Sequence, residues 1–262
     1  MIIDSHAHIG QFKEWNCSIE DLYSQMQREG IKQAIISNIA GNEFDYEHKL
    51  LNEASEEVIN QQTLESIQKY QGIFKMLVWI RPFSEKDLSK LEAFIKKNRE
   101  VVVGLKVHPY CAKVKLNDQR YNPYIHLCEQ YKLPFCIHTE EDGYSNVAYI
   151  KALAEQYPNV NFVAVHMGLK TNHKSAIDAI EKHKNLYGDT TLVDARDVLQ
   201  AIKQCGQHKI LFGSDAITIG DKSYDRYLEL FKQVEEVFGE ETVQAICCKN
   251  IRRIFNLEND RK

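Results

Sequence analysis

The chain alternates short runs of β-branched and other apolar residues with longer, charged segments of helical periodicity. Several of the apolar runs are nearly continuous, such as residues 101–103 and 162–165. Continuous apolar runs are typical of parallel strands that helices cover, rather than of half-exposed antiparallel strands. Eight strands are predicted, over residues 2–5, 33–39, 74–80, 101–107, 133–137, 160–165, 185–193 and 209–212.

Helix signals stand between these runs. Residues 18–21 (Ser-Ile-Glu-Asp) read as a capping box that opens a helix ending at Gly30. Residues 84–87 (Ser-Glu-Lys-Asp) predict the start of a second helix. The longest connection contains a predicted loop and a helix over 46–70, and a terminal helix is predicted over 240–255.

Eight strand-then-helix units account for nearly all of the 262 residues. Units of this kind fit a (β/α)₈ TIM barrel, whose usual length is ~250 residues. We therefore expect one barrel domain over residues 1–262. An open doubly wound sheet shows the same alternation, and periodicity alone does not separate the two folds.

Charge and hydropathy exclude several classes of protein. The net charge is −4 and the pI is about 6.2, which argues against a nucleic-acid or anionic-membrane surface. Lys75 interrupts the apolar run 73–80, which is far shorter than the ~20 residues of a membrane-spanning helix. We expect the first residues to enter a strand directly, because they show no basic region or cleavage site, and the seven cysteines include no CxxC pair. We expect a cytoplasmic protein with reduced thiols that acts on a small molecule, with a homodimer as the default assembly.

The polar residues gather at the ends of the predicted strands. In a barrel of this kind the active site lies at the carboxyl ends of the strands, so these residues are the candidates for chemistry. Six of the eight strands end on ionisable side chains, which include His6, His8, Arg81, Lys106, His138, His166 and Asp215.

The first strand carries two of these candidates, His6 and His8. Residues two apart on a strand share a face and lie ~6.6 Å apart along it, so both imidazoles can reach one ion. His138 from the fifth strand and Asp215 from the eighth, which neighbours the first in a closed barrel, would complete the site. Three imidazoles and a carboxylate suit Zn²⁺, with Mn²⁺, Fe²⁺ and Co²⁺ as alternatives.

A family resemblance runs through these motifs. The strings MIIDSHAHIG, GLKVHPY, FCIHTE, AVHMG and ILFGSDA occur in this order, and KNIRRIFNL follows near the end. Together they resemble the amidohydrolase superfamily, in particular its amidohydrolase-related (amidohydrolase 2) branch, which includes decarboxylases and lactonases. The likeness extends from Met1 to about Leu257.

The resemblance implies roles for the candidate residues. His6, His8 and His138 would bind the metal, and Asp215 would be the fourth ligand or the base that activates a bound water. His166 would act as acid or base in a single-metal enzyme, or would bind a second ion in a two-metal enzyme.

Lys106 is the ambiguous candidate. Two-metal members of the superfamily carry a carbamylated lysine at the end of the fourth strand, which is about the position of Lys106. We favour an unmodified Lys106 that binds a substrate carboxylate, with Arg81 in the same role at the rim of the third strand. The number of metal ions is left open.

The main functional expectation is a metal-dependent hydrolase that cleaves a C–O or C–N bond of a small, carboxylate-bearing molecule with metal-activated water. The alternative is a non-oxidative decarboxylase in which His166 protonates carbon. A TatD-type nuclease is a remote alternative, because that family is expected to have Glu-Thr-Asp where Gly213-Ser214-Asp215 stands here. A barrel that binds a ligand without catalysis would hold no stoichiometric transition metal.

Overall fold

The computed structural model describes residues 1–51, 54–216, 218, 220 and 222–257. Its sheet has the order β2-β1-β3-β4-β5-β6-β7-β8-β9, and all neighbours are parallel except the hairpin partners β1 and β2. The strands are β1 (Ile3–Phe12), β2 (Trp15–Cys17), β3 (Gln33–Asn38), β4 (Phe74–Trp79), β5 (Val102–Val107), β6 (Phe135–Glu140), β7 (Phe162–Leu169), β8 (Leu186–Asp189) and β9 (Ile210–Leu211).

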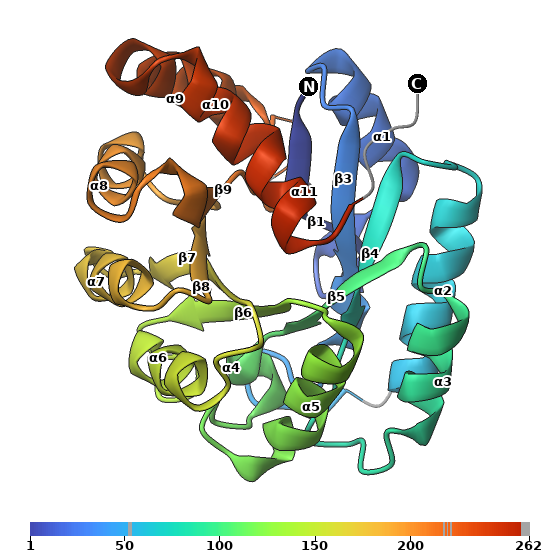
Figure 1. Cartoon of the computed structure of the whole chain (residues 1–262). Helices are drawn as coiled ribbons and strands as arrows, with labels where there is room; N and C mark the ends of the chain where they lie inside the picture. The colour runs from blue at the N-terminus through green and yellow to red at the C-terminus, as the bar shows by residue number, and fades with distance from the viewer. Residues whose placement is uncertain (52–53, 217, 219, 221, 258–262) are drawn as a thin grey trace.

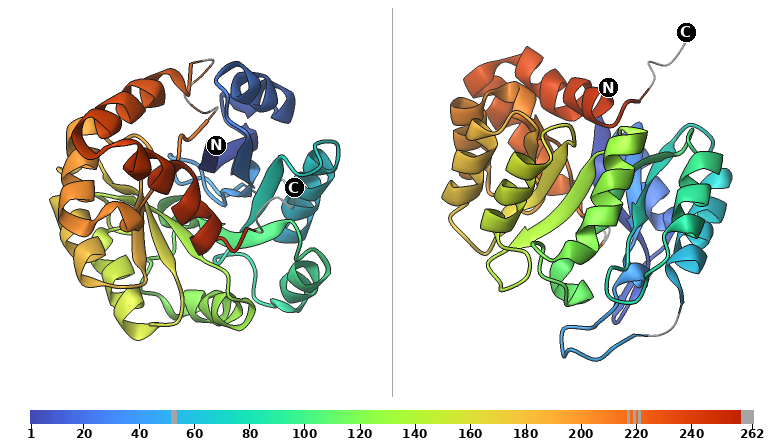
Figure 2. Two further views of the ribbon diagram at one scale, coloured as in Figure 1. Left: turned by 45° about the horizontal axis from the view of Figure 1, so that its top comes forward. Right: turned by 60° about the horizontal axis from the view of Figure 1, so that its bottom comes forward.

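The parallel sheet curls until its first and last strands meet. Ser5 N donates to Phe212 O at 2.9 Å, and an isolated parallel bridge pairs Ala7 with Ala216. Figure 2 shows the strands in the centre of the molecule with the helices around them. This arrangement confirms the predicted (β/α)₈ barrel, and all eight predicted strands are present.

The helices cover the outer face of the sheet and follow the strands in chain order (Figure 1). They are α1 (Ile19–Arg28), α2 (Glu56–Gln68), α3 (Ser89–Lys97), α4 (Pro109–Ala112), α5 (Asn122–Tyr131), α6 (Val147–Gln156), α7 (Lys174–Lys182), α8 (Ala195–Cys205), α9 (Asp225–Phe238), α10 (Glu240–Gln244) and α11 (Asn250–Ile254). A π-helical turn, Ala245–Lys249, joins α10 to α11, so the predicted terminal helix is present with one irregular turn.

Helix starts were predicted with mixed success. The predicted cap of α1 is confirmed, since Ser18 Oγ accepts the Asp21 N–H at 3.0 Å. The predicted helix start at 84–87 is wrong, because α3 begins at Ser89. The Ser84 N–H donates to the distant Glu43 carboxylate at 2.7 Å, and Asp87 Oδ1 accepts the Ser89 N–H at 3.0 Å.

The predicted helix over 46–70 is shorter than expected. Asp45 Oδ1 accepts the N–H groups of Glu47 and Lys49, both at 2.9 Å, and this turns the chain instead of starting a helix. Helix α2 begins at Glu56, after the cap Ser55. Residues 52–53 of the predicted segment lie outside the described residues.

The interior of the barrel and the space beneath the helices are filled by branched and aromatic side chains. All seven cysteines lie in the described ranges, and none of them is in a disulfide bond. Within those ranges, no helix is long and apolar enough to cross a membrane.

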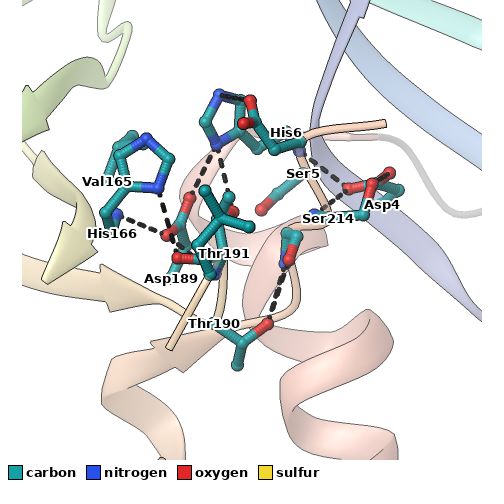
Figure 3. A network of polar contacts seen from close by, with 12 residues as sticks. Asp4, Ser5, His6, Val165, His166, Asp189, Thr190, Thr191 and Ser214 are labelled. Atoms are coloured by element: carbon teal, nitrogen blue, oxygen red, sulfur yellow. Dashed lines mark hydrogen bonds and ion pairs between the residues drawn. The ribbon is translucent and has the colours of Figure 1, made fainter. Parts of the chain in front are cut away.

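Asp4 ties the first strand to the loop that follows the last one (Figure 3). Its fully buried carboxylate accepts hydrogen bonds from Ser214 N at 3.1 Å, from Ser214 Oγ, and from Tyr224 OH at 2.8 Å. Burial raises the pKa of Asp4 to about 7, although the hydrogen bonds from Ser214, His6 and Tyr224 oppose this shift. Asp4 therefore helps to hold the barrel closed at the site end.

Replacing Asp4 with alanine should lower the free energy of unfolding by about 2–4 kcal/mol, because several buried donors lose their acceptor together. Tyr224→Phe removes one donor and should cost only about 1 kcal/mol. Urea denaturation of chelator-treated protein measures both values. An equal loss of unfolding free energy in Asp4→Ala and Tyr224→Phe would contradict the role of Asp4 as the shared acceptor.

Candidate active site

Two histidines of β1 direct their Nε2 atoms toward each other. His6 and His8 are both buried, and their Nε2 atoms lie 3.0 Å apart. The Nδ1 atom of His6 lies 3.0 Å from Asp189 Oδ2, and that of His8 lies 3.3 Å from the carbonyl oxygen of Ser37. Because these oxygens only accept, each Nδ1 carries the proton and each Nε2 carries a lone pair.

Asp215, which is distant in the sequence, lies beside the two histidines. Its Oδ1 lies 3.0 Å from His8 Nε2 and 3.6 Å from His6 Nε2. Burial opposes ionisation, but the closeness of His8 and His6 holds the pKa of Asp215 well below its ordinary value. Burial, followed by the charge of Lys106, lowers the pKa of His6 to about 3. The cluster therefore includes a neutral His6 imidazole and an ionised Asp215 carboxylate.

This donor set fits a divalent metal ion. Two lone pairs and a carboxylate oxygen, separated by 3.0 to 3.6 Å, repel one another unless a cation lies among them. Three atoms at these separations can all reach one ion at the usual ~2.0–2.2 Å. Among the described residues, His6, His8 and Asp215 form the one cluster of three such groups.

His138, the fourth predicted ligand, lies beside the cluster but outside it. Its Nε2 lies 3.1 Å from Glu140 Oε2, and its ring stacks on His108 with 3.7 Å between centroids. The His138 ring also meets the His166 ring edge-on, at 4.6 Å between centroids. A role for His138 as a metal ligand stays a prediction.

Lys106 and Arg81, the two predicted carboxylate binders, have different environments. The Lys106 ammonium is buried, lies 3.0 Å from His6 Nε2 and lines the cavity described below. Burial lowers the pKa of Lys106, and the charges of Asp189 and Asp215 partly offset the shift. Arg81 instead donates to the carbonyl oxygens of Ala54 and, at 3.0 Å, Leu51. It is absent from the described lining of the cavity, so this placement gives its predicted role no support.

A second layer of polar groups, which sequence reasoning missed, orients the first. Asp189, the last residue of β8, holds His6 through Oδ2 and accepts the His166 N–H through Oδ1 at 2.8 Å (Figure 3). Thr191 O lies 3.2 Å from His166 Nδ1, so that Nδ1 carries the proton and Nε2 is left for chemistry. The sequence signal that could have identified Asp189 is a carboxylate at the end of an apolar run, in residues 186–189 (Leu-Tyr-Gly-Asp).

The backbone at the site is held in uncommon conformations. His166, Met167 and Asp215 have φ values of 67°, 47° and 62°, in the left-handed region that few residues other than glycine adopt. Their hydrogen bonds compensate for this cost, as Asp215 N donates to His6 O at 2.8 Å. Strain of this kind is concentrated at functional positions in proteins.

A cavity of about 270 Å³ opens over the cluster. Its floor and rim are polar, with His8, Asn42, Lys106, His108, His138, Glu140, His166, Lys170, Asp215 and Thr218. Its walls are aromatic and aliphatic, with Phe12, Trp15, Ile39, Tyr46, Trp79, Leu169 and Leu192. A small planar molecule with an anionic end that meets Lys106 fits this combination of apolar and polar lining residues.

The sequence matches the model of a family described as Amidohydrolase over residues 3–257. A comparison with curated protein sequences gave no match. Two similar solved structures are decarboxylases. A 5-carboxyvanillate decarboxylase from Sphingomonas paucimobilis has a TM-score of 0.71 and 12% identity, and the match covers 98% of this chain and 99% of that one. A dihydroxybenzoic acid decarboxylase from a Polaromonas species, with bound manganese and 2-nitroresorcinol, has a TM-score of 0.74, 16% identity and coverages of 98% and 97%.

A third similar structure is a probable 2-pyrone-4,6-dicarboxylic acid hydrolase from Acinetobacter baumannii with bound citric acid. It has a TM-score of 0.66 and 15% identity, with coverages of 97% of this chain and 99% of that one. At such identities these structures establish a shared fold and leave the reaction open.

The cluster predicts a metal affinity that depends on His8. Replacing His8 with alanine removes one of three donors and should weaken Mn²⁺ or Zn²⁺ binding by at least about 100-fold. Titration calorimetry on chelator-treated protein measures this affinity. His126→Ala, on the exposed face of α5, is the matched control and should bind as the wild type does. Equal affinities for His8→Ala and wild type would exclude this metal site.

Asp189 should act on the metal only through His6. Asp189→Asn keeps the side-chain shape but removes the charge that holds the His6 ring, so metal affinity should fall by about 10–100-fold. The exposed Asp194→Asn is the control and should leave the affinity unchanged. An unaltered affinity in Asp189→Asn would show that the His6 ring is oriented without this carboxylate.

Proposed function

From the premise that this chain belongs to the amidohydrolase family, we propose that it is a metal-dependent, non-oxidative decarboxylase of a small aromatic carboxylate. Decarboxylases predominate among the similar structures, and this favours our alternative expectation over the hydrolase. The single domain over 1–262, the cytoplasmic location and the homodimer stay predictions.

The observation that carries the proposal is Lys106 at the cavity floor. A buried ammonium is expensive unless an anion accompanies it. In the described part of the chain, no carboxylate forms an ion pair with Lys106, and its hydrogen-bond partner is the neutral His6. A substrate carboxylate would supply the missing negative charge beside the metal cluster.

The walls of the cavity support an aromatic substrate. Trp79 lies over the floor, with its ring centroid 6.2 Å from that of His8. Phe12 and Trp15 are stacked at 5.8 Å, and Tyr46 meets both rings edge-on. Aromatic rings of this kind hold a flat ligand by stacking and by edge-to-face contacts.

His6, His8 and Asp215 would hold the ion, with His138 as a further candidate ligand. A divalent ion bound there would orient the substrate and withdraw electron density from it. The Polaromonas enzyme contains manganese, and the donor set here suits Mn²⁺ as well as the predicted Zn²⁺.

His166 is the proposed acid. Its Nδ1 is engaged by Thr191 O, so Nε2 is the nitrogen that can deliver a proton into the cavity. Burial lowers the pKa of His166, and the charges of Asp215 and Asp189 partly offset this shift. Nε2 therefore has to take up a proton from solvent before the reaction. In the reaction the bond from the ring carbon to the carboxylate breaks, its electron pair stays on the ring carbon, and that carbon takes the proton of His166. Carbon dioxide leaves, and His166 regains a proton from solvent.

A hydrolase is the second candidate, because the same neutral Nε2 of His166 can accept a proton from an attacking water. The similar structure from Acinetobacter, a probable hydrolase, supports this candidate. Hydrolysis places an oxygen atom from water in the product. Decarboxylation instead places a water-derived proton on the carbon that carried the carboxylate.

The test is product analysis after incubation of Mn²⁺- or Zn²⁺-loaded protein with 2,6-dihydroxybenzoate and related aromatic acids. Decarboxylation in D₂O should release carbon dioxide and place one deuterium on the carbon that carried the carboxylate. His166→Asn should lower kcat by about 10²–10⁴-fold, because it removes the proton donor.

The same substrates in H₂¹⁸O provide the opposing result. Incorporation of ¹⁸O into an organic product, without release of carbon dioxide, would refute the decarboxylase and support the hydrolase. His126→Ala serves again as the control variant, since its side chain is exposed and remote from the cavity lining.

A further inference from the structure

Asn42 is a buried residue of the cavity whose side chain has no hydrogen-bond partner among the described residues. It is 5% exposed, it lines the cavity, and its Oδ1 is fully buried. Buried polar atoms in proteins are nearly always paired, so an unpaired amide beside a cavity calls for a functional reason.

The other buried asparagines are all hydrogen-bonded. Asn60, for example, donates to Glu56 O and Trp79 O and accepts from Trp79 N, each at 2.9 Å. Asn38, Asn185 and Asn250 likewise make bonds to the backbone. These residues serve the fold, whereas Asn42 makes no contact of that kind.

The backbone around Asn42 is firmly held. The neighbouring Glu43 carboxylate binds two backbone N–H groups, including that of Ser84 at 2.7 Å. Gly41 lies directly beneath the Trp79 indole, and a Cβ atom there would come within 2.2 Å of the ring. The unpaired amide therefore projects from a rigid segment, which is the arrangement that a preorganised ligand contact requires.

Asn42 also lines the cavity from a different segment of the chain than the charged groups. Lys106 and His8 belong to strands β5 and β1, whereas Asn42 follows the short turn Ile39–Gly41 that ends β3. Its neighbours in the cavity lining include Ile39 and Trp79, which are apolar. A ligand whose carboxylate meets Lys106 can therefore contact Asn42 with another part of its ring, since both residues line one cavity.

We propose that Asn42 is a specificity-determining residue that hydrogen-bonds an uncharged hydroxyl group on the ring of the substrate, away from the carboxylate. The inference rests on the proposed function for the carboxylate end of the ligand. An amide offers one donor group and one acceptor, which matches a hydroxyl group. A second ionic group would gain little from a neutral amide in an apolar wall.

Calorimetric titration of metal-loaded protein with four probes tests the proposal. The probes are benzoate, 2-hydroxybenzoate, 3-hydroxybenzoate and 2,6-dihydroxybenzoate, each with wild type, Asn42→Leu and Asn42→Ala. At least one hydroxylated probe should bind the wild type more tightly than benzoate does and lose about 10–100-fold in affinity in Asn42→Leu. Benzoate should change by no more than about twofold in the same variant.

Thermal stability separates this role from a structural one. Asn42→Leu should melt at the wild-type temperature or above, because it removes a buried group that the fold does not satisfy. Asn60→Leu is the matched control and should melt lower, since it breaks three hydrogen bonds. An equal loss in Asn42→Leu would show that the fold itself uses the amide, and would overturn the proposal.

The binding experiment needs no turnover, so it is independent of the reaction. A selective loss of affinity without any release of carbon dioxide would support Asn42 and refute the decarboxylase. Release of carbon dioxide, with benzoate and hydroxylated probes affected equally by Asn42→Leu, would refute the role of Asn42. Failure of all four probes to bind the wild type would refute it as well.

Discussion

The pairing of the first strand with the chain that follows the last strand is the interaction on which the site depends. Three backbone N–H groups donate across this seam: that of Ser5 to Phe212 O, that of His8 to Ala216 O and that of Asp215 to His6 O. The seam fixes the register of β1, and in a strand a slip of one residue turns every side chain to the opposite face. His6 and His8 point to the same place as Asp215 only while this register holds.

Burial explains why the site is so rich in histidine. A low-dielectric interior favours neutral groups, and it lowers the pKa of His6, His138 and His166. Neutral imidazoles are donors of lone pairs, and Asp215 adds a full negative charge. The interior thus gathers electron-rich atoms whose repulsion a bound divalent ion would relieve, together with the buried Lys106.

The sequence predicted what depends on local pattern and strand order. The eight strands, the cap at Ser18 and the convergence of His6, His8 and Asp215 all follow from periodicity and from the closure of a barrel. Residues whose roles depend on contacts between distant segments could not be predicted in this way. Arg81 reaches a loop rather than the cavity, and the unpaired state of Asn42 is visible only once its surroundings are known.

The π-helical turn Ala245–Lys249 has a consequence for the order in which the protein is made. This turn offers the Ile246 carbonyl to Phe212 N at 2.9 Å, and Asn250 bonds the carbonyl of Ile210, so the C-terminal helices anchor the short strand β9. The first two metal-binding candidates, His6 and His8, are made well before Ile246 and Asn250, which anchor the segment that carries the third. A nascent chain therefore lacks this support for the three-residue cluster until residues 245–250 have been made, and products truncated before them lack it permanently.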